Sequence, residues 1–91
     1  MKTIDQVKEL KKSCYLHIKL ENETIIDFSN IVDKKNYDFY NKVIAYLETQ
    51  PSEEYLKKTL IQLNENISKE TNKNKLDKIN EQIKNIEFIL N

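Results

Sequence analysis

The sequence predicts a mostly helical α+β fold: a short N-terminal helix, a two-stranded antiparallel β-hairpin, and three helices, of which the last two are antiparallel. Residues 14–28 alternate in polarity or favour β structure, whereas both flanks repeat apolar residues every three or four positions. A proline and a polar segment then divide the remainder into three helices. The 91 residues suit one domain, with 1–35 holding the first helix and the hairpin and 36–91 the three helices.

The N-terminal elements change their period near Cys14. Thr3 and Gln6 have the spacing of a capping box, and apolar residues at helical spacing follow, which predicts a helix over residues 4–12. From Cys14 to Leu20 the apolar positions alternate with polar ones, which is typical of a half-buried strand. The β-favouring run 24–28 predicts the returning strand, with a turn at 21–23 that lacks the usual glycine.

The third helix-forming segment carries a wide apolar surface over residues 37–47. Pro51 disfavours helical geometry at Gln50, so this helix is expected to end near Thr49. Ser52 then has the residue type that caps the following helix.

Residues 52–90 contain the two clearest helical patterns, which run from Leu56 to Ile67 and from Leu76 to Leu90. Leu76 lies nine positions after Ile67, and at about 100° per residue the second stripe lies roughly opposite the first. A chain reversal inside residues 68–74 lets both stripes face a common core, which favours an antiparallel helical hairpin. One long helix over 52–90, paired in a dimer, is the alternative.

Composition restricts the function classes. The 15 basic residues, all lysine, balance 15 acidic ones, and the chain has no glycine. Without glycine, a glycine-rich phosphate-binding loop is excluded. Without arginine, the chain has no planar guanidinium group to bind guanine, phosphate or carboxylate through two hydrogen bonds. No cofactor is expected. A single cysteine fits a reducing compartment, and neither a signal peptide nor an apolar run long enough for a membrane is found, so we expect a cytoplasmic protein without membrane contact.

Cys14 and His17 are the residues whose chemistry most resembles a reactive site. On a strand their side chains have opposite parity and point to opposite faces, so they cannot share one metal ion. Zinc also needs about four ligands, and the chain has no other cysteine or histidine. We expect Cys14 in the core and His17 on the outer face, and we expect no metal site, no catalytic residue and no enzymatic activity.

Several residues have the chemistry of a partner contact. Tyrosines are enriched in interface hot spots, four lysines surround the expected turn between the last two helices, and apolar residues beside the last helical stripe exceed what one stripe needs. An open edge of the hairpin would also bind a partner's strand. The alternative is that the monomer itself covers both this edge and the extra apolar residues of the last helix. The candidate partner-binding residues are Tyr15, His17, Tyr55, Lys69, Lys73, Lys75, Phe88 and Ile89.

These observations favour a non-enzymatic protein that occupies the surface of another macromolecule, with a protein as its partner. Small, charge-balanced chains from AT-rich genomes are often phage or mobile-element products that inhibit a host protein, anti-CRISPR proteins among them, an association that rests on frequency and on no single residue. A self-associating module with a homodimer seam over Leu76–Leu90 is the first alternative, so the chain is expected as a monomer or a homodimer. A nucleic-acid accessory protein using Lys8–Lys19 and Lys69–Lys78 is the second, less favoured one.

Overall fold

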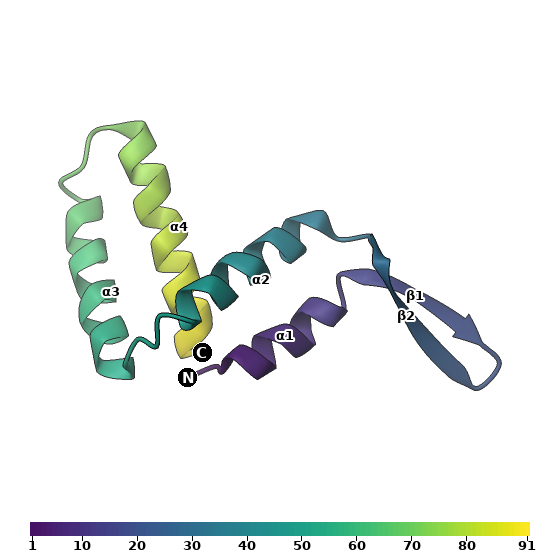
Figure 1. Ribbon diagram of the computed structural model, residues 1–91. Helices are drawn as coiled ribbons and strands as arrows, with labels where there is room; N and C mark the ends of the chain where they lie inside the picture. Colours follow the sequence, from purple (N-terminus) through teal and green to yellow (C-terminus); the bar gives the residue numbers. More distant parts are fainter. The chain divides into compact units, whose positions relative to one another are not determined.

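The computed structural model describes all residues, 1–91, as four helices and one two-stranded sheet. The order of elements confirms the predicted fold class (Figure 1). The chain divides into two compact units, one of residues Thr3–Thr49 and one of Met1–Lys2 with Gln50–Asn91. That residues 1–91 form a single domain stays a prediction. The elements are α1 (Ile4–Lys12), β1 (Tyr15–Leu20), β2 (Glu23–Ile31), α2 (Lys34–Leu47), α3 (Glu53–Ile67) and α4 (Lys73–Leu90).

In the first unit, α1 begins at the predicted capping box. The Thr3 hydroxyl accepts from the backbone N–H of Gln6 at 3.2 Å, and the Gln6 Oε1 accepts from the backbone N–H of Thr3 at 2.9 Å. Two otherwise unpaired N–H groups are thereby satisfied at the start of α1. α1 packs against α2 (Figure 1), and both helices bury valines, Val7 and Val43.

α2 is longer at its start than the apolar pattern predicts. The Asp33 side chain accepts from the backbone N–H of Asn36 at 3.1 Å and caps the helix, which therefore begins at Lys34. It ends at Leu47, two residues before the predicted end. Asp33 also connects the start of α2 to the start of the hairpin, because its backbone N–H donates to the Cys14 carbonyl at 3.2 Å.

The hairpin forms where it is predicted, and its strands pair antiparallel around the two-residue loop 21–22. Leu20 lies opposite Glu23 and Ile18 opposite Ile25. The register then breaks, because Leu16 pairs with Asp27 but Tyr15 pairs with Ile31. Three residues of β2 therefore have no counterpart in β1, and β2 bulges there.

The placement of the hairpin differs from the prediction in two respects. Cys14 belongs to the turn that precedes β1 and not to the strand itself, although it is buried as expected, at 1% exposure. The expected core face of β1 is also mostly solvent-exposed, because Leu16 is half-buried while Ile18 and Leu20 are exposed. The physical reason is the length of the hairpin, which extends beyond the ends of α1 and α2, so that neither helix covers its outer half (Figure 1).

The second unit is the predicted antiparallel helical hairpin of α3 and α4 (Figure 1). Ser52 caps α3 by accepting from the backbone N–H of Tyr55 at 3.1 Å, and the Asn72 side chain caps α4 by accepting from the N–H of Asn74 at 3.0 Å. The chain reverses between Ile67 and Lys73, so the alternative of one long helix is wrong. The core of this unit includes Leu56, Leu63, Ile86 and Ile89.

Candidate partner-binding surface

The hairpin carries most of the large apolar side chains that the fold leaves exposed. Six of the ten such residues lie between positions 18 and 32, and the most exposed are Phe28 at 61% and Val32 at 64%. Single exposed apolar residues are normal, but a contiguous group marks an interaction site. The six are Ile18, Leu20, Ile25, Phe28, Ile31 and Val32.

Four of the strand residues share one face of the hairpin. Leu16, Ile18 and Leu20 have the same parity on β1, and Ile25 lies directly opposite Ile18 on β2. We call these four residues the apolar row. The opposite face carries His17, whose Nε2 lies 3.0 Å from the Lys12 carbonyl oxygen at the end of α1. The hairpin therefore has one face turned to the end of α1 and one face, the apolar row, that is exposed beyond the half-buried Leu16.

The two edges of this sheet differ in their regularity. With only two strands, each has one unpaired edge that is a template for another strand. On β2, however, the Asp27 carboxylate accepts from the N–H of Ser29 at 2.9 Å, its Oγ at 2.5 Å and the Asn30 side chain at 3.1 Å. These bonds lower the pKa of Asp27 and fix the bulge. The β1 edge is thus the regular one.

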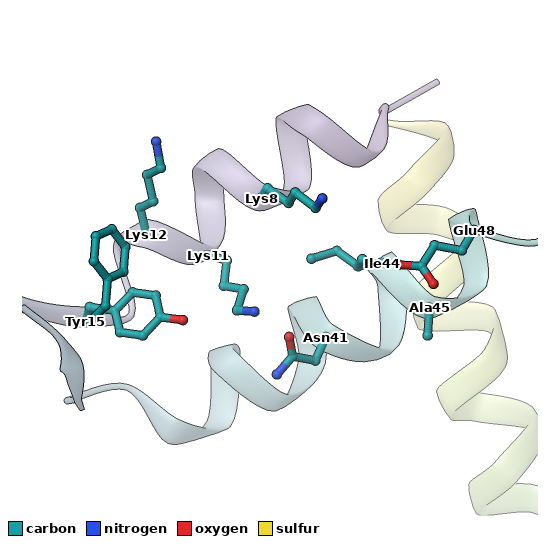
Figure 2. A pocket seen from close by; sticks show the side chains of 9 residues that line it. Lys8, Lys11, Lys12, Tyr15, Asn41, Ile44, Ala45 and Glu48 are labelled. Carbon is teal, nitrogen blue, oxygen red and sulfur yellow. The ribbon is translucent and has the colours of Figure 1, made fainter. Parts of the chain in front are cut away.

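A groove of about 470 Å³ lies at the base of the hairpin, between α1 and α2 (Figure 2). In this view Lys11 of α1 and Ile44 of α2 point into the space between the helices, whereas Lys12 points away from α2. The groove has an apolar part with charged groups around it. Its lining residues are Lys8, Lys11, Lys12, Tyr15, Phe28, Asn41, Ile44, Ala45 and Glu48.

Aromatic rings connect the groove to the base of the hairpin. Tyr15 meets Phe28 edge-on with 5.0 Å between ring centroids, and meets Tyr37 of α2 at 5.8 Å. Such pairs add about 0.5–1.5 kcal/mol beyond burial. Partial burial and the neighbouring Tyr37 raise the pKa of Tyr15 above its ordinary value. The ring cluster anchors the hairpin to α2.

The groove and the tip of the hairpin carry opposite charge. In the groove, Lys12 is paired with Glu9 at 2.7 Å, which leaves Lys8 and Lys11 against the single acid Glu48. The Lys11 ammonium lies 5.0 Å from the centre of the Tyr37 ring, which a cation favours. The groove therefore has surplus positive charge.

The tip of the hairpin is acidic instead. The segment from Lys19 to Glu23 forms a shallow depression of its own, and it includes Glu21 and Glu23 against one lysine. Leu20, the last member of the apolar row, is half-exposed beside these carboxylates. One unit thus presents a cationic groove and, at the other end of the hairpin, an anionic tip with an apolar neighbour.

The residues predicted from sequence as partner contacts are only partly brought together. Tyr15 lines the groove and His17 is exposed on the hairpin, so these two share one surface. The other six belong to the second unit. There Phe88 is half-buried under the Lys2 ammonium, 4.4 Å from the ring centre, and Ile89 has no exposed surface, so we remove Ile89 from the candidate set. Tyr55, Lys69, Lys73 and Lys75 are exposed.

Sequence reasoning missed the apolar row as a surface because it assigned these side chains to the core. One signal was present: Ile25 and Ile26 are adjacent, so β2 is apolar on both faces, which exceeds the need of a half-buried strand. The groove lysines, Lys8 and Lys11, gave no signal of their own, since each is one of many lysines at ordinary helix positions.

No group of three or more His, Cys, Asp or Glu side chains is placed to hold a metal ion. None of the four helices has both the length and the apolar character that crossing a membrane requires. Comparisons with protein-family models, curated proteins and solved structures found no match.

Proposed function

We propose that this chain is a non-enzymatic binding protein that occupies the surface of a protein partner through its β-hairpin. The observation that carries this proposal is the concentration of exposed large apolar side chains on residues 18–32. Moving one such side chain out of water contributes about 1.5–3 kcal/mol when burial is complete, so a partner that covers several of them gains much of its binding energy there. Inhibition of a host protein by a phage or mobile-element product is the specific form of this proposal.

A protein suits this surface better than a nucleic acid does. A regular strand edge offers backbone donors and acceptors to another strand, and the apolar row offers side-chain contacts on alternate positions. Phosphate binding needs many cations on one surface, whereas the hairpin carries Lys19 against Glu21 and Glu23 and the groove has only Lys8 and Lys11 in excess over Glu48. The exposed lysines at the start of α4 are accompanied by acidic residues, so the nucleic-acid alternative has weaker support.

The test removes apolar surface without disturbing the core. Ile18→Thr with Ile25→Thr keeps two β-branched residues at a facing strand pair that is already exposed. The matched control is Ile61→Thr, which changes an isoleucine that is 61% exposed on α3. We expect proteins from the source cells that co-purify with the unmodified chain to be retained by the control and to bind about ten-fold more weakly to the hairpin variant.

Two outcomes would contradict the proposal. Equal retention by the hairpin variant and the control would show that the hairpin is not the contact surface. Release of the captured protein by nuclease digestion would show that nucleic acid bridges the two. Far-UV circular dichroism of all three chains serves as the folding control.

A further inference from the structure

We infer that the hairpin surface is complementary to itself, so that a second copy of this chain is a partner of the surface. The two copies pair their β1 edges antiparallel, and the acidic tip of each hairpin lies in the cationic groove of the other. The inference deepens the proposed function and rests on it, because it names the occupant of the same surface.

The regular edge of β1 can pair with the β1 edge of a second copy so that apolar side chains of both strands lie on the same face of the sheet. Antiparallel pairing keeps side chains on matching faces only when positions of equal parity stand opposite each other. With Ile18 opposite the second copy's Ile18, Leu16 meets the second copy's Leu20, and the reverse. The two apolar rows then merge into one continuous face of a four-stranded sheet. The bulge at Asp27 makes β2 unsuitable for the same pairing.

The length of β1 brings tip and groove together. Six residues at about 3.4 Å each separate the base of β1 from its tip by roughly 20 Å. In the antiparallel arrangement each tip reaches the other copy's strand base, where Tyr15 and Phe28 line the groove. The acidic tip, with Glu21 and Glu23, then approaches the lysines of that groove, while Leu20 stays on the apolar face beside the second copy's Leu16.

The charges at these two places are complementary, and two-fold symmetry doubles each contact. Lys8 and Lys11 have no carboxylate paired with them at salt-bridge distance, and neither have Glu21 and Glu23. A two-fold interface is isologous, so every tip-to-groove contact occurs twice. Edge pairing of short strands buries a modest area, which predicts an association that depends on protein concentration and weakens with salt.

The first measurement is the mass of the unmodified chain in solution. Light scattering from about 10 μM to about 1 mM is expected to show the weight-average mass rising from one chain toward two, with the midpoint moving to higher concentration in high salt. Glu21→Lys with Glu23→Lys is expected to stay monomeric over this range. Both residues are exposed at the tip, so this variant keeps the fold.

The decisive measurement is a charge swap. Lys8→Glu with Lys11→Glu is expected to be monomeric alone, and it keeps α1 helical because glutamate and lysine have similar helix propensities. Mixing this variant with the tip variant is expected to restore dimers that contain one chain of each kind. The matched control is Lys73→Glu with Lys75→Glu, which makes the same charge change in the other unit, dimerises alone, and forms no dimer with the tip variant.

Three outcomes overturn the inference. The first is that the unmodified chain forms no dimer at any concentration, and the second is that the mixed variants fail to pair. The third is that the dimer persists in both swap variants and dissolves on Ile83→Asp, which would place the seam on α4. Each of these leaves the co-purification test of the hairpin intact, because that test compares hairpin and control variants with a different protein. Conversely, loss of the captured protein without any self-association supports the proposed function alone.

Discussion

The Cys14 thiol is shielded from water at the junction of α1 and β1. It is 1% exposed, and its carbonyl accepts from the backbone N–H groups of Val32 and Asp33. Burial raises the pKa of this thiol above its ordinary value of 9.0, and the negative charge of Asp33 adds to the effect. A thiol held protonated in this way is a weak nucleophile, so Cys14 acts as a small core residue.

This raised pKa predicts a loss of stability at alkaline pH. The thiol of the unfolded chain ionises near pH 9.0, whereas the folded thiol stays protonated to higher pH. Its contribution to the free energy of unfolding is therefore fully present below that pH and is lost as pH rises through the folded pKa. Urea titrations should show that free energy falling more steeply above pH 9.0 for the unmodified chain than for Cys14→Ala. The variant should be about 1 kcal/mol less stable at neutral pH. Equal slopes would contradict this assignment.

Individual residues were predictable from sequence where their role depends on near neighbours. The caps at Thr3 and Ser52 follow from side-chain oxygens that reach an N–H three residues on. The burial of Cys14 is confirmed, although it was predicted from a strand face that the structure leaves mostly exposed. The exposure of Ile18 was not predictable, because it depends on how far α1 and α2 extend along the hairpin, and no local pattern encodes that length.

Among the elements, the hairpin contains a turn whose sequence does not suit its geometry. Glu21, the first of the two loop residues, has φ of 42°, and Asn22 has no positive φ. A positive φ at the first position alone is the pattern of a type II′ turn, which favours glycine there. For a residue with a Cβ atom this conformation costs about 1–2 kcal/mol. The hairpin forms in spite of its loop, through its cross-strand pairs and its aromatic base.

We therefore expect Glu21→Gly to stabilise the fold by about 1 kcal/mol, because glycine adopts positive φ without a steric penalty. Thermal unfolding at low protein concentration, where a single chain predominates, is the suitable measurement. Asn22→Ala is the control, since its position requires no special φ and little change is expected. A loss of stability in Glu21→Gly similar to that of a glycine inside a strand would show that the turn geometry is different.

The helices were predicted more accurately than the sheet. The opposing stripes of residues 56–67 and 76–90 favoured a reversal over one long helix, and α3 and α4 confirm it. The bulge of β2 could not be foreseen, because it depends on the Asp27 carboxylate bonding to Ser29 and Asn30 in preference to regular pairing. When side-chain hydrogen bonds replace the regular backbone hydrogen bonds between two strands, the alternation of apolar and polar residues in the sequence does not show it.

At the scale of the whole molecule, the two compact units raise the question of cooperativity. We expect one cooperative unfolding transition, since a chain of 91 residues usually folds as a single domain. The tyrosines allow a direct test, because four of the five lie in one unit. Tyrosine fluorescence therefore reports mainly Thr3–Thr49, whereas far-UV circular dichroism reports the helices of both units. The four are Tyr15, Tyr37, Tyr40 and Tyr46, and the fifth is Tyr55.

Coincident urea midpoints for the two signals would confirm the single domain. Separate midpoints, with fluorescence changing before or after the helical signal, would show that the units unfold independently.

The groove is also a property of the packed molecule. Its lysines and its apolar part come from α1, the hairpin and α2, and only their packing brings them together, so no stretch of sequence could reveal it.

Lys2 links residues at opposite ends of the chain. Its backbone N–H donates to the Ile89 carbonyl at 2.7 Å, and its ammonium donates to the Phe88 carbonyl at 2.8 Å. The first and last residues are therefore close enough to be joined by a short peptide. A circular permutant with that join and new termini in the mostly exposed stretch 68–71 keeps each helix and strand intact, since only their order along the polypeptide changes.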